Sequence, residues 1–410
     1  MDEDGRQLGW LRTNSNFCGV TDGVALFEVK MKTLYKKTGL EHRVLGSKFE
    51  NASYTSTRFV LVIGPTGAGK STFVNALVNY FVGVEYRDDC RFIVATAPKK
   101  GDGNSGTENV TAYTIESLPG FRFRFSLTIV DTPGFGNVEV GKEEENNWSK
   151  IQELFKSEEF GLNRLHLVAF VVTSADHRLS ARAETAYAKV TSIFGNDVVN
   201  NFHIIITHCE IMPKKEIPVL KTLKKAGVPT DFPHYLNFQA VMTKVEDAPQ
   251  GEVAWRKQRK ALQDIRDFLD DDVIPVSLTL TKDNLKKLQF IETKLRELEN
   301  PITGKDTTRR ETHQEFEEKI YTAKKLHETF QEHKTKAMKP YLPYIRKFIS
   351  ILLEEDQVTF RGSCNPAKIE NFETYEEALK KVSKILKEME LKGHSRGKGL
   401  LSHVRSFFGI

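Results

Sequence analysis

The segment Gly64–Ser71, with the sequence GPTGAGKS, constrains the fold of this chain more than any other feature. It satisfies the pattern G-x-x-x-x-G-K-[ST]. A run of apolar and β-branched residues, 58–63, precedes it, and apolar residues at helical spacing, 72–81, follow it. A strand, a glycine-rich loop and a helix start direct backbone N–H groups and the positive end of the helix dipole toward an anion. The sequence therefore predicts a phosphate-binding loop for a nucleoside triphosphate.

Each residue of this loop has a predicted part in binding. Lys70 would reach the β- and γ-phosphates, and the Ser71 hydroxyl would be a ligand of Mg²⁺. The glycines leave room for close approach of the phosphates. The predicted nucleotide-binding residues of the loop are Gly64, Pro65, Thr66, Gly67, Ala68, Gly69, Lys70, Ser71 and Thr72.

Strand and helix patterns alternate from 56 to 275, which predicts an α/β fold with a mostly parallel sheet. One antiparallel hairpin is expected, because a Pro-Gly turn separates 110–116 from 121–130, where apolar and polar residues alternate as in a half-buried strand. Amphipathic helical patterns follow. We therefore expect an N-terminal extension (1–55), a nucleotide-binding domain (56–275) and an α-helical C-terminal domain (276–410).

Composition indicates an ordinary globular protein. Sixty Lys and Arg against 55 Asp and Glu give a net charge of +5, which is too small to indicate nucleic-acid binding. Four widely spaced cysteines and a polar N-terminus predict a cytoplasmic protein. The basic, amphipathic tail, 392–410, has two interpretations: it packs on its own protein, or it makes a peripheral contact with an anionic membrane.

A second motif, D-x-x-G at Asp131–Gly134, follows the alternating strand directly. Asp131 would hold Mg²⁺ through a water, and the Gly134 N–H would meet the γ-phosphate. Between the two motifs lies a polar, glycine-rich segment, 101–108, typical of a switch that γ-phosphate and Mg²⁺ order. The threonine that completes the metal site and serves catalysis is predicted to be Thr111, with Thr107 as the second candidate.

The base-reading residues are predicted after the strand 202–206, at Thr207-His208-Cys209-Glu210. GTPases carry [NT]-K-x-D at this place. A carboxylate there accepts from the two donors of guanine, whereas adenine presents an acceptor at N1. Glu210 would take this part and His208 would replace the lysine stem, while Asn237 is a further candidate for base contact. Guanine is favoured over adenine, and an ATPase with an altered base site stays open.

The order of these motifs resembles the septin-like branch of P-loop GTPases, and is most similar to the immunity-associated (GIMAP) and chloroplast-import (Toc) GTPases and to septins. The resemblance covers roughly 58–245. It implies a GTPase that binds GTP or GDP with Mg²⁺ and forms a homodimer or higher oligomer through its nucleotide face. Thr-His at 207–208 resembles the Toc group, whereas Glu210 departs from both the GIMAP and the Toc pattern.

In Ras-type enzymes a glutamine directly after D-x-x-G orients the attacking water. In this chain that position is occupied by Phe135. Slow intrinsic hydrolysis is therefore expected. The resemblance implies that a partner subunit supplies the missing group. Arg178 is the first candidate, His177 is the second, and a solvated charge is the alternative. Two hypotheses follow: a GTPase that switches self-association or binding of a protein partner, and an assembly protein with marginal hydrolysis. A P-loop kinase is the weakest alternative.

Overall fold

The computed structural model describes the following residues: 7–46, 57–95, 109–135, 141–158, 162–175, 181–209, 217–244, 248–270, 273–299, 313–338, 341, 344–349 and 377–387. The chain divides into two compact units. The first comprises residues 1–187 and 197–279, and the second comprises 188–196 and 280–410. Each unit has its own buried cluster of apolar side chains.

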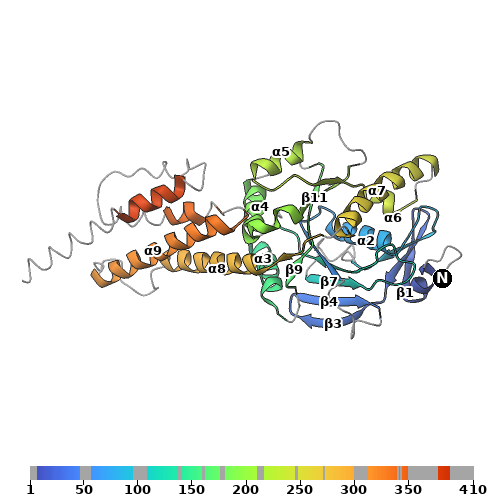
Figure 1. Ribbon diagram of the computed structural model, residues 1–410, viewed down its shortest axis with the longest axis horizontal. Helices are drawn as coiled ribbons and strands as arrows, with labels where there is room; N and C mark the ends of the chain where they lie inside the picture. The colour runs from blue at the N-terminus through green and yellow to red at the C-terminus, as the bar shows by residue number, and fades with distance from the viewer. Residues whose placement is uncertain are drawn as a thin grey trace, which may run out of the picture. The chain divides into compact units, whose positions relative to one another are not determined.

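The first unit is built on an eight-stranded sheet in the order β12-β11-β10-β5-β8-β7-β4-β3 (Figure 1). Neighbouring strands are parallel except in the pairs β7–β8 and β3–β4. The α/β class, the mostly parallel sheet and the antiparallel β7–β8 pair are thus confirmed. The strands are β3 (Lys32–Lys37), β4 (Leu40–Leu45), β5 (Thr57–Ile63), β7 (Val110–Ile115), β8 (Ser126–Asp131), β10 (Leu167–Thr173), β11 (Phe202–Thr207) and β12 (Pro233–Tyr235).

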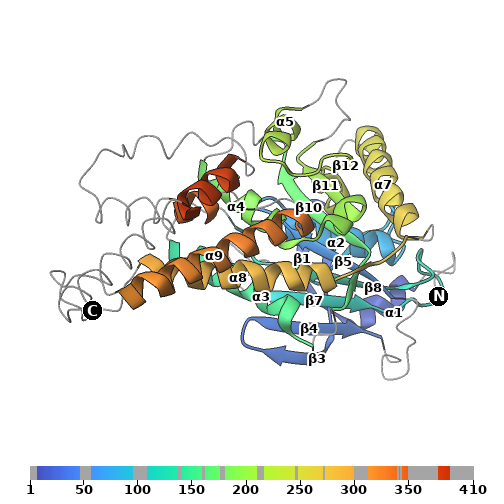
Figure 2. The ribbon, with the colours of Figure 1, turned by 60° about the vertical axis from the view of Figure 1, so that its left-hand side comes forward.

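The N-terminal residues belong to this unit. β4 pairs in parallel with β7, so β3 and β4 extend the main sheet, as Figures 1 and 2 show. A second, three-stranded sheet has the order β1-β2-β6, and its parallel β2–β6 pair joins the N-terminal strands to the segment Cys90–Ile93. The segment expected as a separate extension, 1–55, therefore contributes four strands to the first unit. The remaining elements here are α1 (Leu8–Thr13), β1 (Ser15–Thr21), β2 (Val24–Val29) and β6 (Cys90–Ile93).

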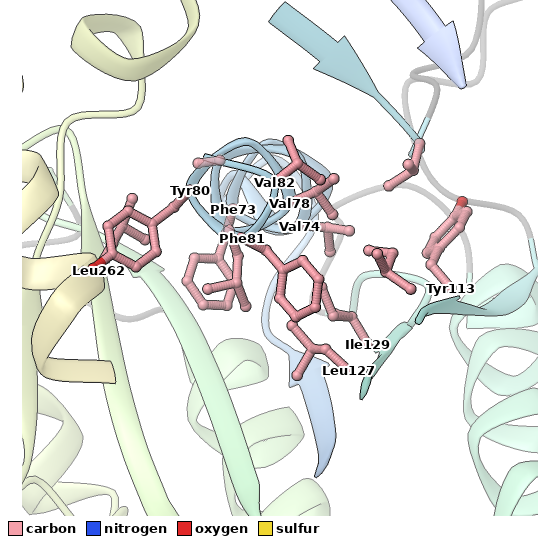
Figure 3. Packing of buried hydrophobic residues seen from close by; sticks show 14 of the residues in the cluster. Phe73, Val74, Val78, Tyr80, Phe81, Val82, Tyr113, Leu127, Ile129 and Leu262 are labelled. Atoms are coloured by element: carbon pink, nitrogen blue, oxygen red, sulfur yellow. The ribbon is translucent and has the colours of Figure 1, made fainter. Parts of the chain in front are cut away.

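Helices cover both faces of the main sheet. On one face, Phe73 and Phe81 of α2 (Lys70–Phe81) pack with Leu127 and Ile129 of β8 (Figure 3). On the other face, Phe170 of β10 contacts the α4 side chain Tyr187, with ring centroids 5.4 Å apart. Because both faces are covered, most residues of β5, β8 and β10 are buried. The other helices and short strands are α3 (Gly141–Lys156), β9 (Arg164–Leu165), α4 (Ala181–Ile193), a 3₁₀ helix (Asn196–Asn201), α5 (Pro218–Lys225), α6 (Gln239–Met242), α7 (Ala248–Asp270) and β13 (Val276–Ser277).

The prediction of a half-buried strand over 121–130 was wrong in extent and in exposure. β8 begins at Ser126, and its residues 127–131 are all buried. The expected polar face is buried because Thr128 shares a 2.7 Å hydrogen bond with Thr114 on β7, which satisfies both hydroxyls. The preceding aromatic residues pack on α2 instead, and the Phe123 ring stacks on Phe81 at 4.6 Å.

Two buried asparagines on α2 hydrogen-bond the main chain of β6 and of the two residues that follow it. The Asn75 Oδ1 accepts from the N–H groups of Val94 and Ala95 at 2.9 and 3.0 Å, and its Nδ2 donates to the Ala95 carbonyl. Asn79, four residues on, binds both the N–H and the carbonyl of Phe92. These hydrogen bonds hold α2 against Phe92, Val94 and Ala95.

The second unit is helical. It contains the last turns of α4 and the long helices α8 (Thr279–Glu299) and α9 (His313–Lys336), with helical segments at 344–349 and 377–387. Its buried cluster includes Ile291, Leu295 and Phe330, so the predicted amphipathic stripes form a core. Among the described residues, no helix is long and apolar enough to cross a membrane. The tail 392–410 lies outside the described residues.

A pair of neighbouring histidines, His203 and His234, makes the stability of the first unit depend on pH. His203 Nδ1 and His234 Nε2 are 2.9 Å apart, beneath Phe232 and Phe268. Burial lowers the pKa of His203 to about 3, assisted by His234, and the pKa of His234 to about 4, opposed by Asp264. Both are therefore neutral in the folded protein at pH 7.

We expect the free energy of unfolding to fall below pH 6.5, since the unfolded chain then binds protons that the folded pair excludes. The loss is about 1.4 kcal/mol at pH 5.5 for each such histidine, and it is absent above pH 7.5. Urea unfolding at pH 7.5 and 5.5 measures it. His203→Phe should reduce the dependence, and an equal dependence in this variant would contradict the assignment.

Candidate nucleotide-binding site

The phosphate-binding loop connects the end of β5 to the start of α2. Gly64 lies so close to β10 that a Cβ there would overlap the Val171 carbonyl group. The loop therefore begins against the neighbouring strand and turns directly into the helix, whose first residue is Lys70. The N–H groups of the first helical turn have no partner within the helix, so they are available to an anion.

Lys70 is folded back over this loop. Its Nζ donates to the carbonyls of Gly64 and Pro65 at 3.1 and 2.9 Å, and the side chain is 7% exposed. Burial lowers the pKa of Lys70 to about 8, although the negative charge of Asp131 opposes the shift. A buried ammonium ion that donates to main-chain carbonyls is poised to exchange them for a phosphate oxygen.

Three oxygen-bearing side chains meet beside the loop. The Ser71 hydroxyl donates to Asp131 Oδ2 at 2.8 Å, and the Asp131 side chain is buried. Thr111 lies opposite Asp131 in the antiparallel β7–β8 pair, so the two side chains point to the same face. A single carboxylate with hydroxyls suits Mg²⁺, which takes oxygen ligands and usually completes its shell with phosphates and water. The residues present therefore fit a magnesium ion.

The D-x-x-G loop lies against the phosphate-binding loop through its main chain. The Thr66 N–H donates to the Phe135 carbonyl at 3.1 Å, and a Cβ at Gly134 would come within 2.7 Å of the Thr66 nitrogen. Asn147 of α3 donates to the Gly134 carbonyl at 3.0 Å. No sequence pattern identifies Asn147 as a site residue, because an amide on a polar helix resembles a solvated residue.

The side chain of Phe135 points away from this site. It is 6% exposed, and its ring contacts Phe170 at 6.1 Å and Tyr187 at 5.6 Å between centroids. The position that bears a glutamine in Ras-type enzymes is thus occupied by a core residue.

Thr207 connects the predicted base-reading loop to the phosphate-binding loop. Its hydroxyl, fully buried, lies 2.9 Å from the Ala68 carbonyl and 3.2 Å from the Val172 carbonyl. The hydroxyl therefore serves an internal hydrogen bond that braces the loop. His208 follows it, exposed and with a left-handed backbone, φ 55°. The Asn237 N–H is bound by Gln258 at 2.6 Å.

The structure brings together most of the predicted site. The loop 64–72 lies beside Asp131 and Gly134 of the second motif, and Thr207 contacts the loop from the opposite side. Arg178, His177, Glu210 and Thr107 lie outside the described residues.

A comparison with curated protein sequences finds no significant match. Among solved structures, Toc33 from Arabidopsis thaliana in complex with Mg²⁺ and GMPPNP is similar, with 18% identity and a TM-score of 0.34 over 54% of this chain and 88% of Toc33. The G domain of the T. maritima FeoB iron transporter has 15% identity and a TM-score of 0.24, over 49% of this chain and 99% of that domain. Residues 58–232 match the sequence profile of the AIG1 family. This match spans the phosphate-binding loop and both further motifs.

Proposed function

We propose that this protein is a Mg²⁺-dependent GTPase that hydrolyses GTP to GDP and phosphate and thereby switches its self-association or the binding of a protein partner. The observation that carries the proposal is the contact of three motifs at one loop. Ser71 hydrogen-bonds Asp131, Thr66 hydrogen-bonds the D-x-x-G loop, and Thr207 hydrogen-bonds the loop carbonyl of Ala68. The AIG1 match adds to this support.

The chain's own residues would bind and orient the triphosphate. Lys70 and the N–H groups of the loop would offset the negative charge of the β- and γ-phosphates. Ser71, Thr111 and Asp131 would hold Mg²⁺, whose positive charge would stabilise the phosphates further. Water would attack the γ-phosphorus while the bond between the γ-phosphorus and the oxygen that bridges it to the β-phosphate breaks. The products are GDP and phosphate. Glu210 and His208 are proposed to read guanine, with Asn237 beside them.

Slow turnover that rises on dimerisation is the second part of the proposal. Because the Phe135 side chain lies in the core, none of its atoms orients the attacking water. We propose that Arg178 of a second copy supplies positive charge to the transferring phosphoryl group. We propose that the protein is cytoplasmic and that its tail, 392–410, makes a peripheral contact with a membrane.

A structural role is the second candidate, and the burial of Phe135 favours it. A septin-like assembly protein would bind GTP to set an interface, with marginal hydrolysis. This candidate needs the same nucleotide site and differs only in turnover and in nucleotide-dependent sedimentation.

The test is a titration of nucleotide-free protein with labelled GTP and ATP, with phosphate release followed at several protein concentrations. We expect GTP to bind at least tenfold more tightly than ATP, a difference of about 1.4 kcal/mol. The rate per molecule should climb with concentration in the wild type and not in Arg178→Ala, with Arg182→Ala as the matched control. GTP binding with a flat, negligible rate would favour the assembly protein, and a preference for ATP would contradict both candidates.

A further inference from the structure

The two loops that follow β11 and β12 are tied to each other. The Leu236 N–H donates to the Ile206 carbonyl at 2.8 Å as part of the strand pairing, and beyond it the Cys209 N–H donates to the Leu236 carbonyl at 3.3 Å. In open α/β sheets, ligands bind at the carboxyl ends of the strands. These loops are therefore placed to form one side of a base site. The positions of their backbones determine the shape of that side.

Ser174, the residue after β10, holds the first of these loops. Its N–H donates to the Thr207 carbonyl at 3.0 Å, and its Oγ donates to the His208 carbonyl at 2.9 Å. His208 has φ 55°, a left-handed conformation that costs a non-glycine residue free energy. Such a conformation persists where surrounding contacts fix it. Ser174 supplies two of those contacts, because it donates hydrogen bonds to the carbonyl before His208 and to the carbonyl of His208 itself.

Gln258 holds the second loop. This α7 side chain is 1% exposed, and its Oε1 accepts from the Asn237 N–H at 2.6 Å. The next residue, Phe238, packs on Phe73 of α2 with ring centroids 5.9 Å apart, and lies 3.6 Å from the place of a Cβ on Gly69. The loop that Gln258 fixes is therefore adjacent to the phosphate-binding loop.

We infer that Ser174 and Gln258 are positioning residues that set the discrimination between guanine and adenine. This inference rests on the proposed function. Hydrogen bonds weaken steeply with distance and angle, so a base is discriminated only by groups that cannot shift to suit another base. Neither side chain contacts the phosphate-binding loop in the described structure, whereas each binds the main chain of a base-reading loop. Their removal should therefore act on the base and not on the phosphates.

The experiment measures dissociation constants of GTP, ATP and inorganic tripolyphosphate for the wild type, Ser174→Ala and Gln258→Leu. We expect GTP affinity to fall about tenfold in each variant, while affinities for ATP and tripolyphosphate change less than twofold. Ser174→Thr and Gln258→Glu keep an acceptor or donor of similar reach and should retain most of the preference. Thr222→Ala, which removes a hydroxyl bound to the Pro218 carbonyl within α5, is the matched control.

The outcomes separate this inference from the proposed function. A wild type that prefers GTP, with variants that keep the same GTP-to-ATP ratio, overturns the inference alone. An equal fall for tripolyphosphate also overturns it, since the residues then support the whole site. A wild type without preference for GTP overturns the proposed function and the inference with it. If Gln258→Leu fails to fold, as thermal unfolding would show, Ser174→Ala and the Ser174→Thr rescue decide the matter.

Discussion

Lys70→Ala should abolish measurable GTP binding without destabilising the nucleotide-free protein. The ammonium group would make charge-assisted hydrogen bonds to phosphate, each contributing about 1.5–3 kcal/mol, so affinity should fall about 100-fold or more. In this structure the same group is buried with a pKa of about 8. A lysine whose folded pKa lies below its unfolded value favours unfolding. This penalty is complete below pH 8 and disappears above pH 10.5.

The size of that penalty is about 3 kcal/mol at pH 7, from the pKa difference. The carbonyls of Gly64 and Pro65 lose a donor in the variant, which offsets part of the gain. We therefore expect the midpoint of thermal unfolding to stay equal or to rise, while calorimetry detects no GTP binding. Lys260→Ala, an exposed lysine on α7 paired with Asp264, is the control for loss of charge. A variant that binds GTP normally would contradict the assigned site.

The phosphate-binding loop could be predicted from the sequence because its determinants are contiguous. Strand, glycines, Lys70 and helix lie within about 25 residues, and local conformation places them. The bracing of the loop by Thr207 depends instead on a hydrogen bond to a residue 139 positions away. Nothing in the local pattern tells whether a hydroxyl at that position faces the ligand or the protein.

Two further features of the fold were beyond local patterns for the same reason. The pairing of β4 with β7 joins segments about 70 residues apart, and strand propensity does not name a partner. On α2, the apolar stripe was visible, but Asn75 and Asn79 are polar residues on the buried side of the helix. Their side chains hydrogen-bond the main chain of β6 and of the residues just after it. A sequence pattern assigns such residues to the solvent, and only the tertiary hydrogen bonds explain their burial.

Phe135→Ala should destabilise the protein by about 3–5 kcal/mol, the range for truncating a buried phenylalanine to alanine. The ring is 6% exposed and fills space between Phe170 and Tyr187, so its removal leaves a cavity against β10 and α4. Urea unfolding measures the change, with Phe17→Ala as the control, since Phe17 is 62% exposed. A loss as small as that of the control would show that the ring is not held in the core.

Phe135→Gln tests the same residue for catalysis, and we expect no gain in GTP hydrolysis. The main chain of Phe135, not its side chain, contacts the phosphate-binding loop, because the Phe135 carbonyl accepts from Thr66. A glutamine would therefore enter the pocket between Phe170 and Tyr187 and bury an unpaired amide, which costs about 1–3 kcal/mol beyond the lost packing. Single-turnover phosphate release at saturating GTP, at a protein concentration held below dimerisation, measures the effect. A tenfold faster rate with unchanged stability would contradict this expectation and show that the side chain at this position reaches the γ-phosphate.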